Sequence, residues 1–190
     1  NATLSEINAD RFGEIAALCS SLGAQRLGFS RLVPSGRGSN LVNRMIEPKK
    51  VKQIYAEIFS ISADGLEIVT GDPVASQMRR EPGVDDYGSV PTGGCAAGVS
   101  GLTILPDGTI VPCRRLPLPL GNVRRDSLRE IWANSKILEQ LRDRGSYEGK
   151  CGVCRRWAQC RGCRAIAYSR SLALAEGNFL AEDPQCFITH

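Results

Sequence analysis

The chain has 190 residues, of which 42% are hydrophobic and 23% are charged. These proportions are typical of globular proteins and exclude a disordered or fibrous chain. No apolar run resembles a membrane span or a signal peptide, so we expect no membrane partner. The formal net charge is +4, but the basic residues are scattered and lack interleaved aromatics, which argues against nucleic-acid binding. Because the first residue is Asn1 rather than Met, we expect a processed or truncated product.

The first half of the chain alternates between helix and strand patterns. Apolar residues recur at helical spacing in residues 8–22, and again in residues 47–59, where Pro48 suits a helix start. Strand-like runs follow at residues 27–33 and 66–69. This α-β-α-β series predicts a parallel sheet with covering helices, and its brevity indicates the end of a barrel with further strands upstream.

A change in character marks the middle of the chain. Between Val74 and Gly94 the periodicity disappears, while Gly, Pro and charged residues accumulate. We therefore expect a boundary near residues 72–82, which divides the chain into residues 1–78 and residues 79–190.

The second half begins with a hairpin signal. Residues 101–105 and 109–113 are strand candidates joined by Pro106-Asp107-Gly108, and Gly108 tolerates the positive φ that such a turn needs. Further on, Ser127 and Glu130 fit a capping box that opens one helix extending to residue 141. We expect this helix to pack over the hairpin.

The eight cysteines are distributed unevenly. Cys19 lies alone on the apolar side of the first predicted helix, where a small core residue is the simplest interpretation. Clustered thiols in a chain without secretion signals more often bind metal than form disulfides, so we expect a reducing cytoplasm. The other seven fall in the C-terminal half: Cys95, Cys113, Cys151, Cys154, Cys160, Cys163 and Cys186.

The densest segment is Cys151-x2-Cys154-x5-Cys160-x2-Cys163. A two-residue gap lets neighbouring thiolates turn toward one metal ion or cluster. A zinc knuckle is the alternative, but the gap between the pairs is short against the roughly 15–20 residues usual in paired zinc sites. One zinc ion would also leave cysteines unused. Two four-iron clusters account for the seven thiols better, and their negative charge would largely cancel the formal net charge of the chain.

These spacings resemble the SPASM domain of radical S-adenosylmethionine (radical SAM) enzymes. The resemblance includes Cys95-x12-Gly108-x4-Cys113, the four-cysteine segment and Cys186, together with residues 121–123, 127–132 and 183–186. The α-β-α-β series is similar to the last units of the family's partial (β/α)6 barrel. One spacing departs from the common pattern: two residues, rather than three, separate Cys160 from Cys163, a variant associated with members resembling the haem-pathway enzymes.

The resemblance implies an α/β fold in which residues 1–78 end a partial (β/α)6 barrel. Residues 79–190 would form a small α+β, cysteine-rich SPASM domain with a β-hairpin and two auxiliary [4Fe–4S] clusters. The implied ligands of the first cluster are Cys95, Cys113 and Cys163. The implied ligands of the second are Cys151, Cys154, Cys160 and Cys186. Because the first set has three cysteines, its fourth iron is open to substrate or takes a ligand other than cysteine.

The resemblance also implies a function. Radical SAM enzymes cleave S-adenosylmethionine at a third [4Fe–4S] cluster held by CxxxCxxC, and the resulting 5′-deoxyadenosyl radical abstracts hydrogen from a substrate. This sequence contains no CxxxCxxC, so we expect the chain alone to be inactive. A reducing partner such as flavodoxin or ferredoxin is implied. The expected substrate is a peptide or protein, and the alternative substrate is a tetrapyrrole (a haem or haem d1 precursor). The alternative to an enzyme function is a non-catalytic zinc-binding interaction module.

One loop and one pair of arginines have more than one interpretation. Arg31, Ser35, Gly36, Arg37 and Gly38 follow the first predicted strand, where a parallel barrel carries its ligand-binding loops. They are candidates for contacts with S-adenosylmethionine or substrate, but a solvated turn explains them equally well. The pair of arginines at positions 114 and 115 suits the propionates of a tetrapyrrole, and equally a peptide backbone or solvent.

Overall fold

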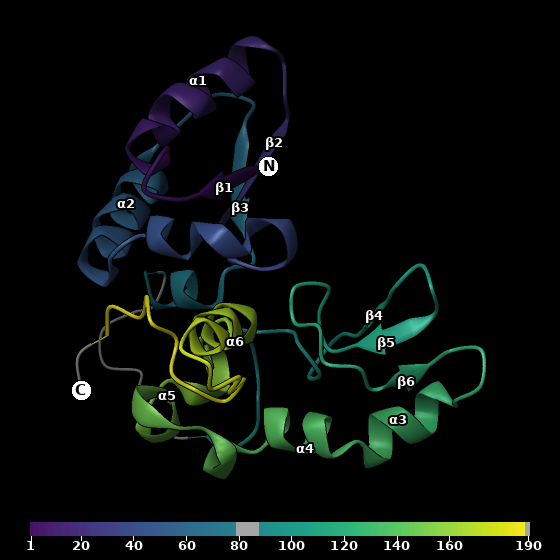
Figure 1. Ribbon diagram of the computed structural model, residues 1–190. Coiled ribbons are helices and arrows are strands. Elements are labelled where there is room, and N and C mark those ends of the chain that lie inside the picture. The colour runs from purple at the N-terminus through teal and green to yellow at the C-terminus, as the bar shows by residue number, and fades with distance from the viewer. Residues whose placement is uncertain (79–87, 189–190) are drawn as a thin grey trace.

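The computed structural model describes residues 1–78 and 88–188. The first three strands and two helices lie at one end of the molecule, and the remaining strands and helices lie at the other (Figure 1). The expected division at residues 78 and 79 borders a connection that lies outside the described residues. Within the two described ranges, no helix is long and apolar enough to cross a membrane.

The first sheet is parallel, as the alternating pattern predicts. Its strands β1 (Ala2–Leu4), β2 (Arg26–Arg31) and β3 (Glu67–Thr70) stand in the order β1-β2-β3. Phe29 of the central strand aligns with Ala2 on one side and with Thr70 on the other. The sequence analysis missed β1 because three residues are too few to show an alternating pattern.

Two helices, α1 (Phe12–Ser21) and α2 (Pro48–Ser60), connect these strands. Pro48 occupies the first turn of α2, where its missing N–H costs no hydrogen bond. Helix α1 starts four residues later than the apolar spacing predicts, because a 3-10 turn precedes it. Cys19 of α1 is partly buried against the core, in agreement with its predicted role.

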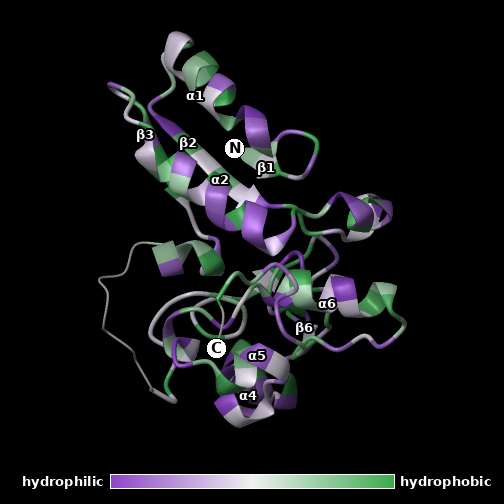
Figure 2. Ribbon diagram, turned by 90° about the vertical axis from the view of Figure 1, so that its left-hand side faces the viewer, coloured by the Kyte–Doolittle hydropathy of each residue, from purple (hydrophilic) through white to green (hydrophobic). Residues whose placement is uncertain are grey.

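The core of this half is aromatic. The Phe29 ring lies 5.4 Å from Phe12, 5.5 Å from Tyr55 and 6.0 Å from Phe59, measured between ring centroids. Edge-on contacts at such distances stabilise a core beyond simple area burial. Hydrophilic and hydrophobic residues alternate around α1 and α2 (Figure 2). The apolar side of α2 supplies a fully buried set to this core: Val51, Ile54, Tyr55 and Ile58.

The second sheet is small and antiparallel. Its strands β4 (Thr103–Ile104), β5 (Thr109–Val111) and β6 (Gly121–Asn122) stand in the order β4-β5-β6. The turn between β4 and β5 contains Gly108 with a φ of 86°, a left-handed conformation that glycine adopts without strain. Cys113 lies two residues after the end of β5.

The sequence analysis was wrong about a single helix after Ser127. The structure contains two, α3 (Leu128–Asn134) and α4 (Lys136–Arg142), because the backbone of Ser135 is extended, with φ −69° and ψ 119°. The capping residue was predicted correctly, since Ser127 Oγ accepts a hydrogen bond from the Glu130 N–H at 3.4 Å. The break lets α3 lie beside β6 while α4 buries Leu138 and Leu141 elsewhere.

Short elements complete the second half. Helix α5 (Gly149–Val153) precedes a compact loop, and α6 (Arg164–Ala173) follows it. The first half also contains the 3-10 segments η1 (Ala9–Arg11), η2 (Gly36–Arg44) and η3 (Pro73–Met78). The second half contains the 3-10 turns η4 (Arg144–Ser146) and η5 (Trp157–Gln159). This half has smaller apolar clusters than the first, so its shape depends more on polar contacts and loops.

Candidate metal centre

Three of the predicted ligands meet at one cavity of about 260 Å³, which Cys95, Cys113 and Cys163 line. They come from a loop before β4, from the end of β5 and from the residue before α6. The loop that carries Cys95 lies against the Cys160 backbone, because the Cys95 N–H donates to the Cys160 carbonyl at 3.1 Å. Gly94 permits this approach: its φ is 70°, and a Cβ there would overlap the Cys160 backbone.

The other four predicted ligands line a second, narrower cavity of about 20 Å³: Cys151, Cys154, Cys160 and Cys186. Cys151 belongs to α5 and Cys154 ends that helix, so one short helical turn brings the two thiols to the same side. The 3-10 turn η5 then leads to Cys160. The Cys186 N–H donates to the Asp183 carbonyl at 3.1 Å, in a turn of the C-terminal segment.

Cys160 and Cys163 line different cavities although only two residues separate them. Those two residues, Arg161 and Gly162, both have left-handed backbone, with φ of 59° and 60°. A residue other than glycine pays about 1–3 kcal/mol for such a conformation, so Arg161 needs strong contacts to hold it. The left-handed pair reverses the chain direction. The short gap noted in the sequence therefore divides the cysteines between two sites.

Burial is the main cause of a raised pKa in four of these thiols. It raises the pKa of Cys160 and of Cys163 to about 12, and that of Cys186 to about 11. The pKa of Cys154 is raised by the same cause. These groups are protonated at neutral pH as free thiols. Because metals bind the thiolate form, metal uptake here must release protons.

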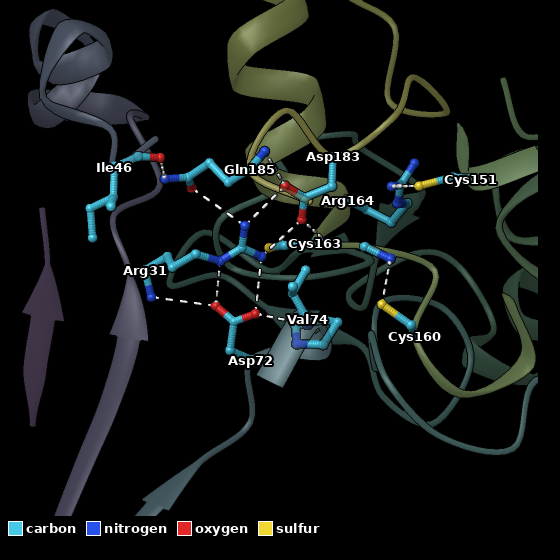
Figure 3. Close-up of polar contacts among 12 residues, drawn as sticks. Arg31, Ile46, Asp72, Val74, Cys151, Cys160, Cys163, Arg164, Asp183 and Gln185 are labelled. Carbon is cyan, nitrogen blue, oxygen red and sulfur yellow. Dashed lines mark hydrogen bonds and ion pairs between the residues drawn. The ribbon is translucent and has the colours of Figure 1, made fainter. Parts of the chain in front are cut away.

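Both interpretations of Arg31 were wrong: its side chain is neither available to a ligand nor part of a solvated turn. Its side chain is fully buried and forms ion pairs with Asp72, from Nε at 2.7 Å, and with Asp183, from Nη2 at 2.8 Å (Figure 3). Both carboxylates also accept a second hydrogen bond from the same guanidinium. Two bidentate pairs use four of its five donors, and Nη1 also donates to Gln185 Oε1 at 3.4 Å. Arg37, in the 3-10 segment η2, is exposed to solvent.

Asp183 joins the first sheet to the cysteine-bearing segments. Besides Arg31, it accepts hydrogen bonds from the N–H groups of Cys163 at 2.8 Å and Gln185 at 2.9 Å. Gln185 in turn donates to the Ile46 carbonyl at 2.7 Å (Figure 3). Burial would raise the pKa of Asp183, but the charge and hydrogen bonds of Arg31 outweigh it, so the pKa is lowered and the group stays ionised.

Three buried N–H donors beside the second cavity have no acceptor within residues 1–78 and 88–188: Trp157 Nε1, Arg161 Nε and Arg164 Nε. Trp157 and Arg161 also line that cavity. A buried donor without an acceptor costs roughly 1–3 kcal/mol, so such groups usually have a partner. Among the described residues, no three Cys, His, Asp or Glu side chains are placed to hold a single metal ion.

The sequence analysis did not single out these buried polar residues. The signal was present in Cys160-Arg-Gly-Cys163-Arg, because two arginines inside a metal-binding motif contradict the rule that arginines lie at the surface. Asp183 belongs to the segment 183–186 that resembles the family, but its partner Arg31 is 152 positions away in the sequence, so spacing alone does not reveal the pair.

Comparisons with known proteins agree with this geometry. Residues 95–164 match the family model SPASM, described as an iron–sulfur cluster-binding domain. The AdoMet-dependent heme synthase of Nitratidesulfovibrio vulgaris is 32% identical, over 98% of this chain and 52% of its own length. The PqqA peptide cyclase of Streptomyces rochei is 29% identical, over 98% of this chain and 50% of its own length. The structure of SuiB from Streptococcus suis has a TM-score of 0.58 at 15% identity, covering 98% of this chain and 44% of that one.

The fold and the cysteines thus define an iron–sulfur domain joined to a mixed α/β unit. The chain contains a SPASM domain at residues 95–164 and is similar along nearly its whole length to an AdoMet-dependent heme synthase and a PqqA peptide cyclase. It spans about half the length of the curated relatives that it matches.

The residues around the two cavities fit iron–sulfur clusters. Thiols are the protein ligands of such clusters, and their sulfur atoms accept hydrogen bonds from surrounding donors. The second cavity offers four thiols and the donors without acceptors described above. The first cavity offers three thiols and the side chain of Arg115, whose buried Nε also lacks an acceptor.

Proposed function

We propose that this chain is the C-terminal, cluster-binding part of a radical SAM enzyme and holds two auxiliary [4Fe–4S] clusters. The first would be held by Cys95, Cys113 and Cys163. The second would be held by Cys151, Cys154, Cys160 and Cys186. The observation that carries the proposal is the division of seven cysteines between two cavities.

The chain's own residues would prepare these sites. Arg161 and Gly162 direct neighbouring cysteines to opposite sides, and Asp183 fixes the Cys163 backbone while anchoring the segment that carries Cys186. Because ligands of each cluster come from distant segments, cluster binding would be coupled to folding of this half. When bound, such clusters supply an electron relay or an iron site for substrate, in a cytoplasmic enzyme served by a flavodoxin or ferredoxin.

The parallel order β1-β2-β3 supports the proposal that residues 1–78 end a partial (β/α)6 barrel. The sequence contains no CxxxCxxC motif, so a catalytic cluster and S-adenosylmethionine would bind outside this chain. The chain alone would therefore be inactive, and would take part in 5′-deoxyadenosyl-radical chemistry only within the longer protein.

The choice of substrate has two candidates. The identity of 32% to a heme synthase, together with the short gap between Cys160 and Cys163, favours a tetrapyrrole. Arg115 lines the first cavity and has an unused buried donor, which suits a propionate. The expected peptide substrate is supported by the identity of 29% to a peptide cyclase. We place the tetrapyrrole first.

The experiment is anaerobic reconstitution of the chain, followed by iron, sulfide and zinc analysis. Two clusters predict about eight irons and eight sulfides per chain, with broad brown absorbance. The Cys19→Ser variant is the matched control, because Cys19 packs against the core of the first sheet and should leave the iron content unchanged. A colourless protein with stoichiometric zinc would contradict the proposal in favour of the zinc-binding module.

A further inference from the structure

Two arginines lie buried between the two cysteine sets. Arg161 is 2% exposed and Arg164 is 0% exposed, and both flank the Gly162-Cys163 step at which the chain passes from one cavity to the other. Arginine is almost never fully buried unless its charge is paired. Their burial therefore requires an explanation.

Arg164 reaches the second cysteine set directly. Its Nη2 donates to Cys151 Sγ at 3.5 Å (Figure 3), and its Nη1 donates to the carbonyls of Ala181 at 2.7 Å and Phe179 at 3.3 Å. The guanidinium carbon lies 4.8 Å from the centre of the Tyr147 ring. Its Nε has no acceptor in the described part of the chain. One thiol sulfur, two carbonyls and a ring thus surround the cation.

Arg161 spans the space between the two sets. Its Nη1 donates to the Ala158 carbonyl at 2.9 Å, and its Nη2 donates to the carbonyls of Gly93 and Cys95, each at 2.6 Å. The side chain lines the second cavity, while Cys95 lines the first. These bonds hold the left-handed conformation of Arg161, but carbonyl oxygens do not cancel its charge.

Neither arginine forms an ion pair with a carboxylate among the described residues, in contrast to Arg31, which pairs with two. A buried charge without a counter-charge is costly. The nearby Asp183 is already paired with Arg31. The remaining source of negative charge is the cysteine sets themselves, since an oxidised four-iron cluster with four thiolates carries about −2.

We propose that Arg161 and Arg164 are the counter-charges of the auxiliary clusters, and that Arg164 raises the reduction potential of the cluster held by Cys151. This inference rests on the proposed function. A fixed cation beside a cluster stabilises the reduced form more than the oxidised form, because reduction adds negative charge. The buried donors without acceptors then have cluster sulfur as their partner.

The test compares Arg164→Gln and Arg164→Lys in the reconstituted chain. Iron is counted first, and the potential of each cluster is then measured by redox titration monitored by electron paramagnetic resonance. For R164Q we expect the ratio of reduced to oxidised second cluster at a fixed potential to fall at least tenfold, a shift of 59 mV for one electron. R164K keeps the charge and should shift less. The matched control is Arg170→Gln, which removes the same charge from the exposed side of α6.

The inference is overturned if R164Q and R170Q give the same potentials as the unaltered chain. If R164Q loses four irons while R164K keeps eight, the positive charge at position 164 is required for cluster binding, and this result supports the inference. If both variants lose iron, the reduction potentials of the clusters are measured in Arg161→Gln instead. Potentials equal to those of the unaltered chain would then overturn the inference. Failure of the unaltered chain to take up iron would instead contradict the proposed function.

Discussion

Three buried arginines differ in the partners of their charge. Arg31 has two carboxylates, whereas Arg161 and Arg164 have backbone carbonyls, aromatic rings and a cysteine sulfur. The first arrangement is complete within the described chain. In the second arrangement, the positive charges of Arg161 and Arg164 have no carboxylate partner among the described residues, so a bound anion would stabilise them. Residue chemistry therefore separates a structural arginine from those that face the proposed clusters.

The first prediction concerns Arg31. Arg31→Met leaves Asp72 and Asp183 as two buried carboxylates without a cation, which should lower the free energy of unfolding by about 3–5 kcal/mol. Urea unfolding of the variant and of the unaltered chain measures this difference in free energy. The matched control is Arg26→Met on the same strand, whose ion pair with Glu67 is exposed and should contribute no more than about 1 kcal/mol. Equal effects of the two substitutions would contradict a structural role for the buried pair.

At the scale of elements, the left-handed backbone of Arg161 and Gly162 before α6 places Cys160 and Cys163 at different cavities. Gly162 has a φ of 60°, and a Cβ there would lie 2.6 Å from the Asp183 Cβ and 2.7 Å from Arg164 Nη2. These neighbours are packed on all sides and cannot move away cheaply. One glycine thus couples the four-cysteine segment to α6 and to the C-terminal segment.

We therefore predict that Gly162→Ala lowers the free energy of unfolding by about 2 kcal/mol or more, from backbone strain together with the clash. Iron content after reconstitution should fall as well, because Cys163 is displaced. The control is Gly13→Ala in α1, where a Cβ meets nothing within 4 Å and should be neutral or stabilising. Normal stability and full iron content in G162A would contradict this account of the turn.

Much of the element pattern could be predicted from periodicity and turn residues. The long apolar repeats gave α1 and α2, and Ser127 marked the start of α3. The break at Ser135 could not be predicted, because the separate burial of Leu138 and Leu141 depends on tertiary packing. The three-residue strand β1 is likewise defined by its neighbour β2 rather than by its own sequence.

At the scale of the whole molecule, a polar network joins the two halves. Asp183 connects Arg31 of the first sheet to the Cys163 backbone, and Gln185 connects the C-terminal segment to Ile46. The family resemblance divided the cysteines into the same two sets that line the two cavities. The network itself was beyond prediction, since it depends on residues far apart in the sequence.

The central claim is that seven cysteines form two separate cluster sites. The most direct test is electron paramagnetic resonance of the reduced, reconstituted chain in two double variants, Cys95→Ser with Cys113→Ser, and Cys154→Ser with Cys160→Ser. Each pair removes ligands from one cavity only. We predict that each variant keeps about four irons and one of two distinct cluster signals, and that the two variants keep different signals. Loss of both signals in either variant, or the same surviving signal in both, would contradict the division into two sites.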